Sequence, residues 1–298
     1  LPLKKMPYNK FMLIKTRNFS QASLDHFRDL QRLSFSILEQ TAAELEIGET
    51  EKDVAQKLVK RYREARASSF FHLPVVLFGD RTALPGDWSV GKFFPKSKSL
   101  HHNDSVILDA APLFDGYLVD TSYSFCFGES GTHRKMMQHL SQYRESVLAA
   151  VNSGENFKTI ADQVADTMQQ QGYCVAHTKH PGEVLGHRAI QTANLPFQLR
   201  LQGFDALSLT WFKMKDSLAM RGLGRQSPLW NSLKSSDHKP HDGLWLVEPH
   251  AGLDNVGAKW EEILVIADGR AGWLDDNPPH VRQWAKITQS KDYSPRTS

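Results

Sequence analysis

The chain has 298 residues, 40% hydrophobic and 23% charged, so it is long enough to bury a large core. Its net charge is only +3 and its Lys and Arg residues form no dense run, which argues against a nucleic-acid partner. No apolar stretch approaches the roughly eighteen residues of a membrane span, and two cysteines exclude a disulfide framework. We therefore expect a cytoplasmic protein with no membrane partner.

The first half of the chain predicts two helices followed by a strand. Apolar residues recur at helical spacing from about 23 to 46, and Thr50 with Asp53 is typical of a capping box that opens a second helix. The run from Phe70 to Phe78, rich in Phe, Val and Leu, predicts a strand. Residues 1–19 are predicted to be an N-terminal extension.

The same order of elements returns in the second half. Helices are predicted at about 133–151 and 159–171, followed by strands at about 173–190, 243–253 and 260–266. This weak repeat leaves open two related halves or two unrelated helix pairs. Residues 191–242 are too long for an ordinary loop and predict an elaboration over the site, helical from about 209 to 220. We expect one domain over 20–285 and a flexible tail over 286–298.

Two aspartates flank a hairpin in the middle of the chain. Asp109 ends one apolar strand, and Asp120 follows the strand after an Asp115-Gly116 turn, so the hairpin brings the two carboxylates together. Close, buried carboxylates repel each other unless a cation lies between them, and a divalent metal is the natural cation. Carboxylates that cap turns are the alternative interpretation.

Two more acids and two histidines extend this pattern. Glu248 ends one apolar strand and Glu261 opens another. Taken alone, Glu261 and its neighbour Glu262 could belong to a solvated edge, although alternation lets only one of them face solvent, and His180 and His187 could be ordinary buried histidines. Together with the two aspartates, however, four carboxylates and one imidazole suit two divalent ions such as Mn, Co, Fe or Zn. Two such ions lower the pKa of a shared water, which predicts hydrolysis by a metal-bridging hydroxide.

The pattern resembles the M24-type pita-bread metallopeptidases, among them methionine aminopeptidase, prolidase, aminopeptidase P and creatinase. The resemblance rests on the ordered residues Asp109, Asp120, His180, Glu248 and Glu261, on Gly116-Tyr117 before the second aspartate, and on Glu248-Pro249. It covers about residues 20–274 and implies an α+β fold. In this fold, two pseudo-symmetric halves pack their helices outside a curved antiparallel sheet.

The resemblance also implies roles for these residues. Asp109 would hold one ion, Asp120 and Glu261 would bridge both, and His180 and Glu248 would bind the other. Glu248 would transfer protons, and His187 would contact the substrate carbonyl as a second catalytic residue. We also assign His250, which follows Glu248-Pro249 where the family usually has Gly, to substrate binding.

Other positions depart from the family pattern. Pro181-Gly182-Glu183 follows His180 where the family usually has Gly, a hydrophobic residue and Gly; Gly86-Asp87 follows Pro85 where the family commonly has a His; and Lys259 stands where prolidase-like enzymes often carry Arg. The leading hypothesis is an aminopeptidase or an Xaa-Pro-type dipeptidase, with a short peptide or small molecule as substrate. One alternative is an enzyme that acts on a small non-peptide substrate, by C–N hydrolysis or by iron-dependent chemistry. The other is a catalytically silent binding module, and a homodimer is an open option.

Overall fold

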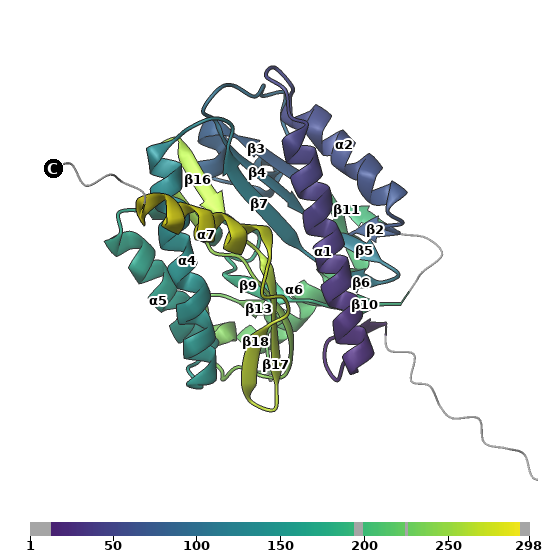
Figure 1. Ribbon diagram of the computed structural model, residues 1–298. Helices are drawn as coiled ribbons and strands as arrows, with labels where there is room; N and C mark the ends of the chain where they lie inside the picture. The colour runs from purple at the N-terminus through teal and green to yellow at the C-terminus, as the bar shows by residue number, and fades with distance from the viewer. Residues whose placement is uncertain (1–12, 194–198, 224–225, 293–298) are drawn as a thin grey trace, which may run out of the picture.

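The computed structural model describes residues 13–193, 199–223 and 226–292. Two pairs of long helices lie outside a set of antiparallel strands (Figure 1). In the first half these helices are α1 (Gln21–Ala43) and α2 (Glu51–Glu64). The side chain of Ser20 caps α1, and Thr50 with Asp53 forms a complete capping box at α2. The predicted helix pair and its capping box are therefore confirmed.

The strands of the first half form two sheets. One has the order β3-β4-β7 and consists of β3 (Val75–Phe78), β4 (Ser105–Ala110) and β7 (Thr121–Cys126). The other has the order β1-β10-β6-β5-β2 and consists of β1 (Ile14–Lys15), β10 (Gln191–Thr192), β6 (Tyr117–Leu118), β5 (Pro112–Phe114) and β2 (Ser69–Phe70). β5 and β6 form the predicted hairpin around Asp115 and Gly116, whose φ angles of 47° and 83° suit this tight turn.

The predicted continuous strand from Phe70 to Phe78 is wrong. β2 ends at Phe70 and β3 begins at Val75, and the two belong to different sheets. Pro74 lacks a backbone donor, so the sequence around it cannot continue a strand ladder. The break allows residues 71–73 to turn toward the interface of the two sheets.

The second half repeats the arrangement. Its helices are α4 (Gly131–Asn152) and α5 (Phe157–Gln170), and α7 (Pro279–Asp292) packs against α4. One sheet has the order β16-β15-β8, with β16 (Val256–Lys259), β15 (His250–Leu253) and β8 (Cys174–Val175). The other has the order β13-β9-β14-β17-β18, with β13 (Leu229–Trp230), β9 (Gly186–Arg188), β14 (Gly243–Val247), β17 (Glu262–Ala267) and β18 (Arg270–Trp273).

Each helix pair covers its own core. Phe27 and Leu38 of α1 pack with Leu58 of α2 in one cluster, whereas Leu140 of α4 and Ile160 of α5 pack with tryptophans of the second half in another. β16 contacts β4 and β7, so the sheets of the two halves meet in the middle of the molecule (Figure 1). This architecture confirms the prediction of two similar halves with helices outside antiparallel strands.

The remaining elements are short or belong to the predicted elaboration. They are η1 (Gly79–Ala83), α3 (Val90–Phe93), η2 (Ala176–Lys179), β11 (Arg200–Leu201), β12 (Phe204–Asp205), α6 (Ala206–Met220) and η3 (Lys234–Ser236). Residues 286–292, predicted to lie in a flexible tail, are part of α7, and 293–298 lie outside the described residues. Within the described ranges, no helix is long and apolar enough to cross a membrane.

Candidate metal centre

The two aspartates come from the central strands of the first half. Asp109 lies in β4, opposite Ser122 of β7, and Asp120 directly precedes β7. Both are buried, with exposures of 3% and 1%. Their carboxylates approach the same atom, His72 Nε2, at 3.5 Å and 3.3 Å. The two carboxylates therefore lie close together, as the hairpin pattern predicts.

The two glutamates come from the second half. Glu248 follows β14, and Glu261 lies between β16 and β17, where it forms a backbone bridge with Ser122 of β7. This bridge joins the halves and brings Glu261 beside the aspartates. Its neighbour Glu262 points elsewhere, into a buried pair with Arg144. Neither glutamate at 261–262 lies on the solvated edge that the sequence left open.

His180 and His250 form a buried chain of hydrogen bonds. His250 Nε2 donates to the backbone oxygen of Thr82 at 2.7 Å, so its Nδ1 accepts from His180 Nε2 at 3.0 Å. His180 Nδ1 lies 2.8 Å from Glu248 Oε2. Both ring nitrogens of His180 are thus engaged. His180 lines the cavity, whereas His250 is not among the described residues that line it, so its substrate contact stays a prediction.

His187 of β9 faces the carboxylates with its Nε2 atom. Its Nδ1 donates to the backbone oxygen of Arg188 at 3.1 Å. Nε2 lies 3.6 Å from Asp120 Oδ2 and 4.0 Å from Glu261 Oε1. A proton or a metal ion between Nε2 and these oxygens would make this arrangement favourable. His187 also lines the cavity, where the sequence predicts a substrate contact.

His72 is a residue of the site that the sequence analysis missed. It stands in the break between β2 and β3 and donates from Nδ1 to the backbone oxygen of Leu73 at 2.9 Å. Burial lowers its pKa, but the carboxylates of Asp120 and Asp109 outweigh this effect and raise it to about 9. The available signal was His-Leu-Pro inside an apolar run, since a proline there predicts a strand break.

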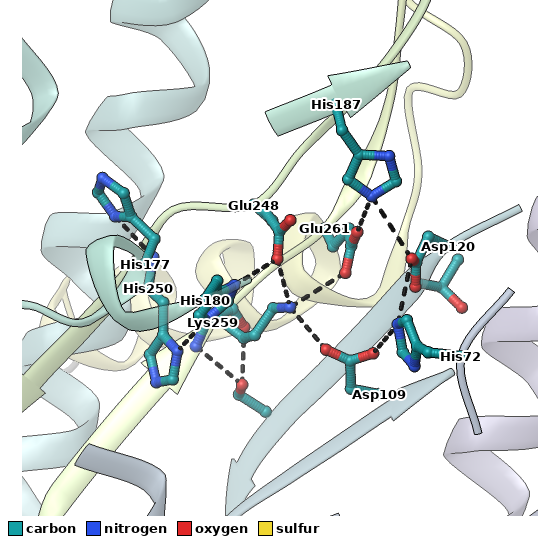
Figure 2. Close-up of polar contacts among 12 residues, drawn as sticks. His72, Asp109, Asp120, His177, His180, His187, Glu248, His250, Lys259 and Glu261 are labelled. Atoms are coloured by element: carbon teal, nitrogen blue, oxygen red, sulfur yellow. Dashed lines mark hydrogen bonds and ion pairs between the residues drawn. The ribbon is translucent and has the colours of Figure 1, made fainter. Parts of the chain in front are cut away.

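Lys259, at the end of β16, reaches into the centre of the acidic cluster. Its Nζ lies 2.6 Å from Asp109, 2.9 Å from Glu248 and 3.1 Å from Glu261 (Figure 2). The side chain is only 3% exposed. The sequence showed Lys259 as a departure from the family pattern, but not its contact with three of the predicted metal ligands.

The electrostatic environment differs among the acids. Burial and the neighbouring carboxylate of Asp120 raise the pKa of Glu261 well above its usual value, and burial also raises the pKa of Asp109. Burial opposes ionisation of Glu248 too, but Lys259 and His180 prevail and hold its pKa well below the usual range. Glu248 is therefore ionised between Lys259 and His180, and its role in proton transfer stays a prediction.

The donor atoms fit a divalent ion on the Asp120 side of the cluster. Asp109 Oδ1, Asp120 Oδ1 and Glu261 Oε1 are buried without a hydrogen-bond partner, a costly state for carboxylate oxygens. Two groups could hold a metal, His72-Asp109-Asp120 and Asp120-His187-Glu261, and they share Asp120. The Glu248 side already holds an ammonium group. The M24-type role of Asp120 as a shared ligand is thus compatible with the geometry.

A cavity of about 280 Å³ opens onto this cluster. Aromatic side chains form much of its wall: Phe71, Phe93, Phe94, Phe204 and Phe212. Leu209, Phe212, Lys213, Asp216 and Ser217 of α6 also contribute, so the predicted elaboration does cover the site. Trp230, by contrast, is fully buried in the core.

Comparisons with known proteins agree with this geometry. Among solved structures, the fold is similar to X-Pro aminopeptidase from Thermotoga maritima, at 17% identity and a TM-score of 0.62 over 89% of this chain and 63% of that one. It is also similar to Xaa-Pro dipeptidase from Bacillus anthracis, at 17% identity and a TM-score of 0.61 over 89% of this chain and 62% of the dipeptidase chain. Prolidase from Pyrococcus furiosus is 15% identical, with a TM-score of 0.62 over 89% of this chain and 66% of the prolidase chain.

These structural relatives confirm the predicted pita-bread fold, and the chain spans less than two thirds of the length of each. No curated protein matches the chain. The sequence profile of metallopeptidase family M24 matches residues 25–194, which is more than half of the chain. This protein therefore belongs to metallopeptidase family M24.

Proposed function

We propose that this chain is a metal-dependent hydrolase that releases the N-terminal residue of short peptides, with Xaa-Pro peptides as the first substrates to test. The observation that carries the proposal is the set of three buried carboxylate oxygens without a hydrogen bond beside the aromatic cavity. Membership in family M24 and the similarity to an X-Pro aminopeptidase and an Xaa-Pro dipeptidase support the choice of substrate.

A bound divalent ion would supply a Lewis acid and lower the pKa of water. Asp120 would hold it, together with Glu261 and His187 or with Asp109 and His72, the two groups of described residues that could hold a metal. The sequence predicts two ions, of Mn, Co, Fe or Zn, and this number and identity stay predictions. The cytoplasmic location and the homodimer also stay predictions.

The chain's own side chains suit a small substrate with polar ends. The phenylalanine wall excludes water and strengthens electrostatic interactions near the carboxylates. His72, protonated at Nε2, places a positive charge at the same end of the cavity. Lys213 of α6 is an exposed cation in the lining, suited to pair with the C-terminal carboxylate of a dipeptide.

The aromatic lining also favours a second candidate, hydrolysis of a small non-peptide amide. One screen separates the two. The purified protein is stripped of metal, loaded with Mn²⁺, Co²⁺, Fe²⁺ or Zn²⁺, and incubated with a panel of dipeptides, tripeptides and small amides. We expect metal-stimulated peptide release that is lost in Asp120→Asn. Turnover of amides alone would favour the second candidate, and no turnover with any metal would refute both.

A further inference from the structure

Lys259 is held rigidly at the centre of the acidic cluster. Its backbone nitrogen donates to Ser124 Oγ at 3.0 Å, and the Ser124 hydroxyl donates to the backbone oxygen of Lys259 at 2.7 Å. This clamp and the antiparallel pairing of β15 with β16 fix where the side chain starts. An ammonium group has three hydrogens, and three carboxylates lie in hydrogen-bonding range of Nζ. All three hydrogens of the Lys259 ammonium group can therefore be donated to carboxylates of the cluster.

The contacts of Lys259 divide the oxygens of the cluster into two sets. Nζ donates to the first set, which consists of Asp109 Oδ2, Glu248 Oε2 and Glu261 Oε2. The other oxygens of Asp109 and Glu261, together with Asp120 Oδ1, have no hydrogen-bond partner and contact only histidine nitrogens at 3.5 Å or more. A divalent ion that used Oδ2 and the two Oε2 atoms would compete for the space and the lone pairs that the ammonium already uses. Only the second set is available to a metal ion.

The hydrogen bonds of His180 also indicate that the Glu248 part of the cluster is not available to a metal ion. Its Nε2 carries a hydrogen, because it donates to His250 Nδ1, and its Nδ1 faces the Glu248 oxygen that also contacts Lys259. His180 belongs to neither of the two groups of described residues that could hold a metal. The predicted ligands His180 and Glu248 thus bind each other, and Glu248 also binds Lys259.

The ammonium group also opposes a second ion by its charge. A divalent ion beside Asp109 Oδ2, Glu248 Oε2 and Glu261 Oε2 would lie against the positive charge of Lys259 in a buried site, at a large electrostatic cost.

We propose that the Lys259 ammonium occupies the position of one cation of the M24-type pair. The chain consequently binds a single divalent ion, held by Asp120 with Glu261 and His187, because His72 already pairs with Asp109 and Asp120. This inference rests on the metal-binding part of the proposed function. It does not depend on which substrate is cleaved.

The test is the number of ions bound per chain. The natural protein and three variants are stripped with a chelator, titrated with Mn²⁺ alone by calorimetry, and measured by elemental analysis after removal of free metal. Lys259→Met removes the charge and keeps the length of the side chain. Lys213→Met is the matched control, because Lys213 lines the same cavity but contacts none of these carboxylates in the structure. Asp120→Asn removes the shared ligand.

We expect one Mn²⁺ in the natural chain and in Lys213→Met, two in Lys259→Met, and none in Asp120→Asn. Two ions in the natural chain, or one in both the natural chain and Lys259→Met, would overturn the inference and leave a metal-dependent function intact. The natural chain could instead bind no ion while Lys259→Met binds at least one. That result would overturn the metal-dependent function, but it would support the inference that the Lys259 ammonium occupies a cation position. No ion in either would overturn both.

Lys259→Met removes the ammonium partner of three buried acids and could fail to fold without metal. The titration of the natural chain then decides the question by itself, because saturation at two ions refutes the inference. Thermal unfolding of Lys259→Met gives a second readout: Mn²⁺ should raise its melting temperature more than that of the natural protein, since two ions bind in place of one. An equal rise in both would count as a refutation.

Discussion

Removal of Arg144 should destabilise the protein strongly, because it leaves a buried carboxylate unpaired. Arg144 of α4 binds Glu262 through two parallel contacts, Nε to Oε1 at 2.6 Å and Nη2 to Oε2 at 3.1 Å. Glu262 is 0% exposed. The pair anchors the start of β17, one residue after Glu261, to a helix of the second half.

The magnitude follows from this geometry. Breaking a buried ion pair by removing one partner costs about 3–5 kcal/mol. The lower end applies here, because His280 Nε2 remains 2.9 Å from Glu262 and the Arg144 side chain is 16% exposed. We expect about 3 kcal/mol for Arg144→Met, or a melting temperature lower by roughly 6–12 °C.

Chemical denaturation followed by circular dichroism measures this free energy. Arg134→Met, at an exposed position of the same helix, is the matched control and should change stability by about 0.5 kcal/mol or less. Arg144→Met combined with Glu262→Gln should recover part of the loss, since the unpaired charge is gone. A loss below about 1 kcal/mol for Arg144→Met would refute the reasoning.

Three further outcomes are expected. Asp120→Asn should lower the amount of Mn²⁺ bound at equilibrium, measured by elemental analysis, because both candidate ligand groups share Asp120; unchanged metal would contradict this. Burial lowers the pKa of His133 to about 4 from an ordinary 6.5, so folding excludes its proton. The free energy of unfolding should therefore keep its full contribution from neutral His133 above pH 6.5 and fall by up to roughly 3 kcal/mol toward pH 4. In His133→Leu, denaturation measured across that range should show a weaker dependence of this free energy on pH. Gly257→Ala should lower the melting temperature, because a Cβ there would lie 2.0 Å from the backbone oxygen of Thr82, whereas Gly91→Ala meets nothing within 4 Å and should not.

The helices and their ends could be predicted from the sequence, because local interactions decide them. Helical spacing of apolar residues gave α1, α2, α4 and α5 within a few residues, and Thr50 with Asp53 marked the start of α2. The turn at Asp115-Gly116 was predictable for the same reason, since its positive φ angles require particular residues. The strand from Phe70 to Phe78 failed because an apolar run does not reveal which sheet each of its ends joins.

The acids of the site were also visible in the sequence. Asp109, Asp120, Glu248 and Glu261 stand at or near the ends of apolar strands, where a carboxylate is costly without a partner, and the structure brings all four together. Order and spacing were enough to indicate the family, and the family profile confirms it.

The sequence by itself thus determined the elements and the acids of the site, and the tertiary structure decided what neutralises those acids. Lys259 and His72 come from opposite halves of the chain, and both point into the cluster, whereas His250 lies behind His180. Such contacts depend on the side-chain direction of one sheet relative to another, which no local pattern encodes. An ammonium group among predicted metal ligands is therefore a property of the packed molecule.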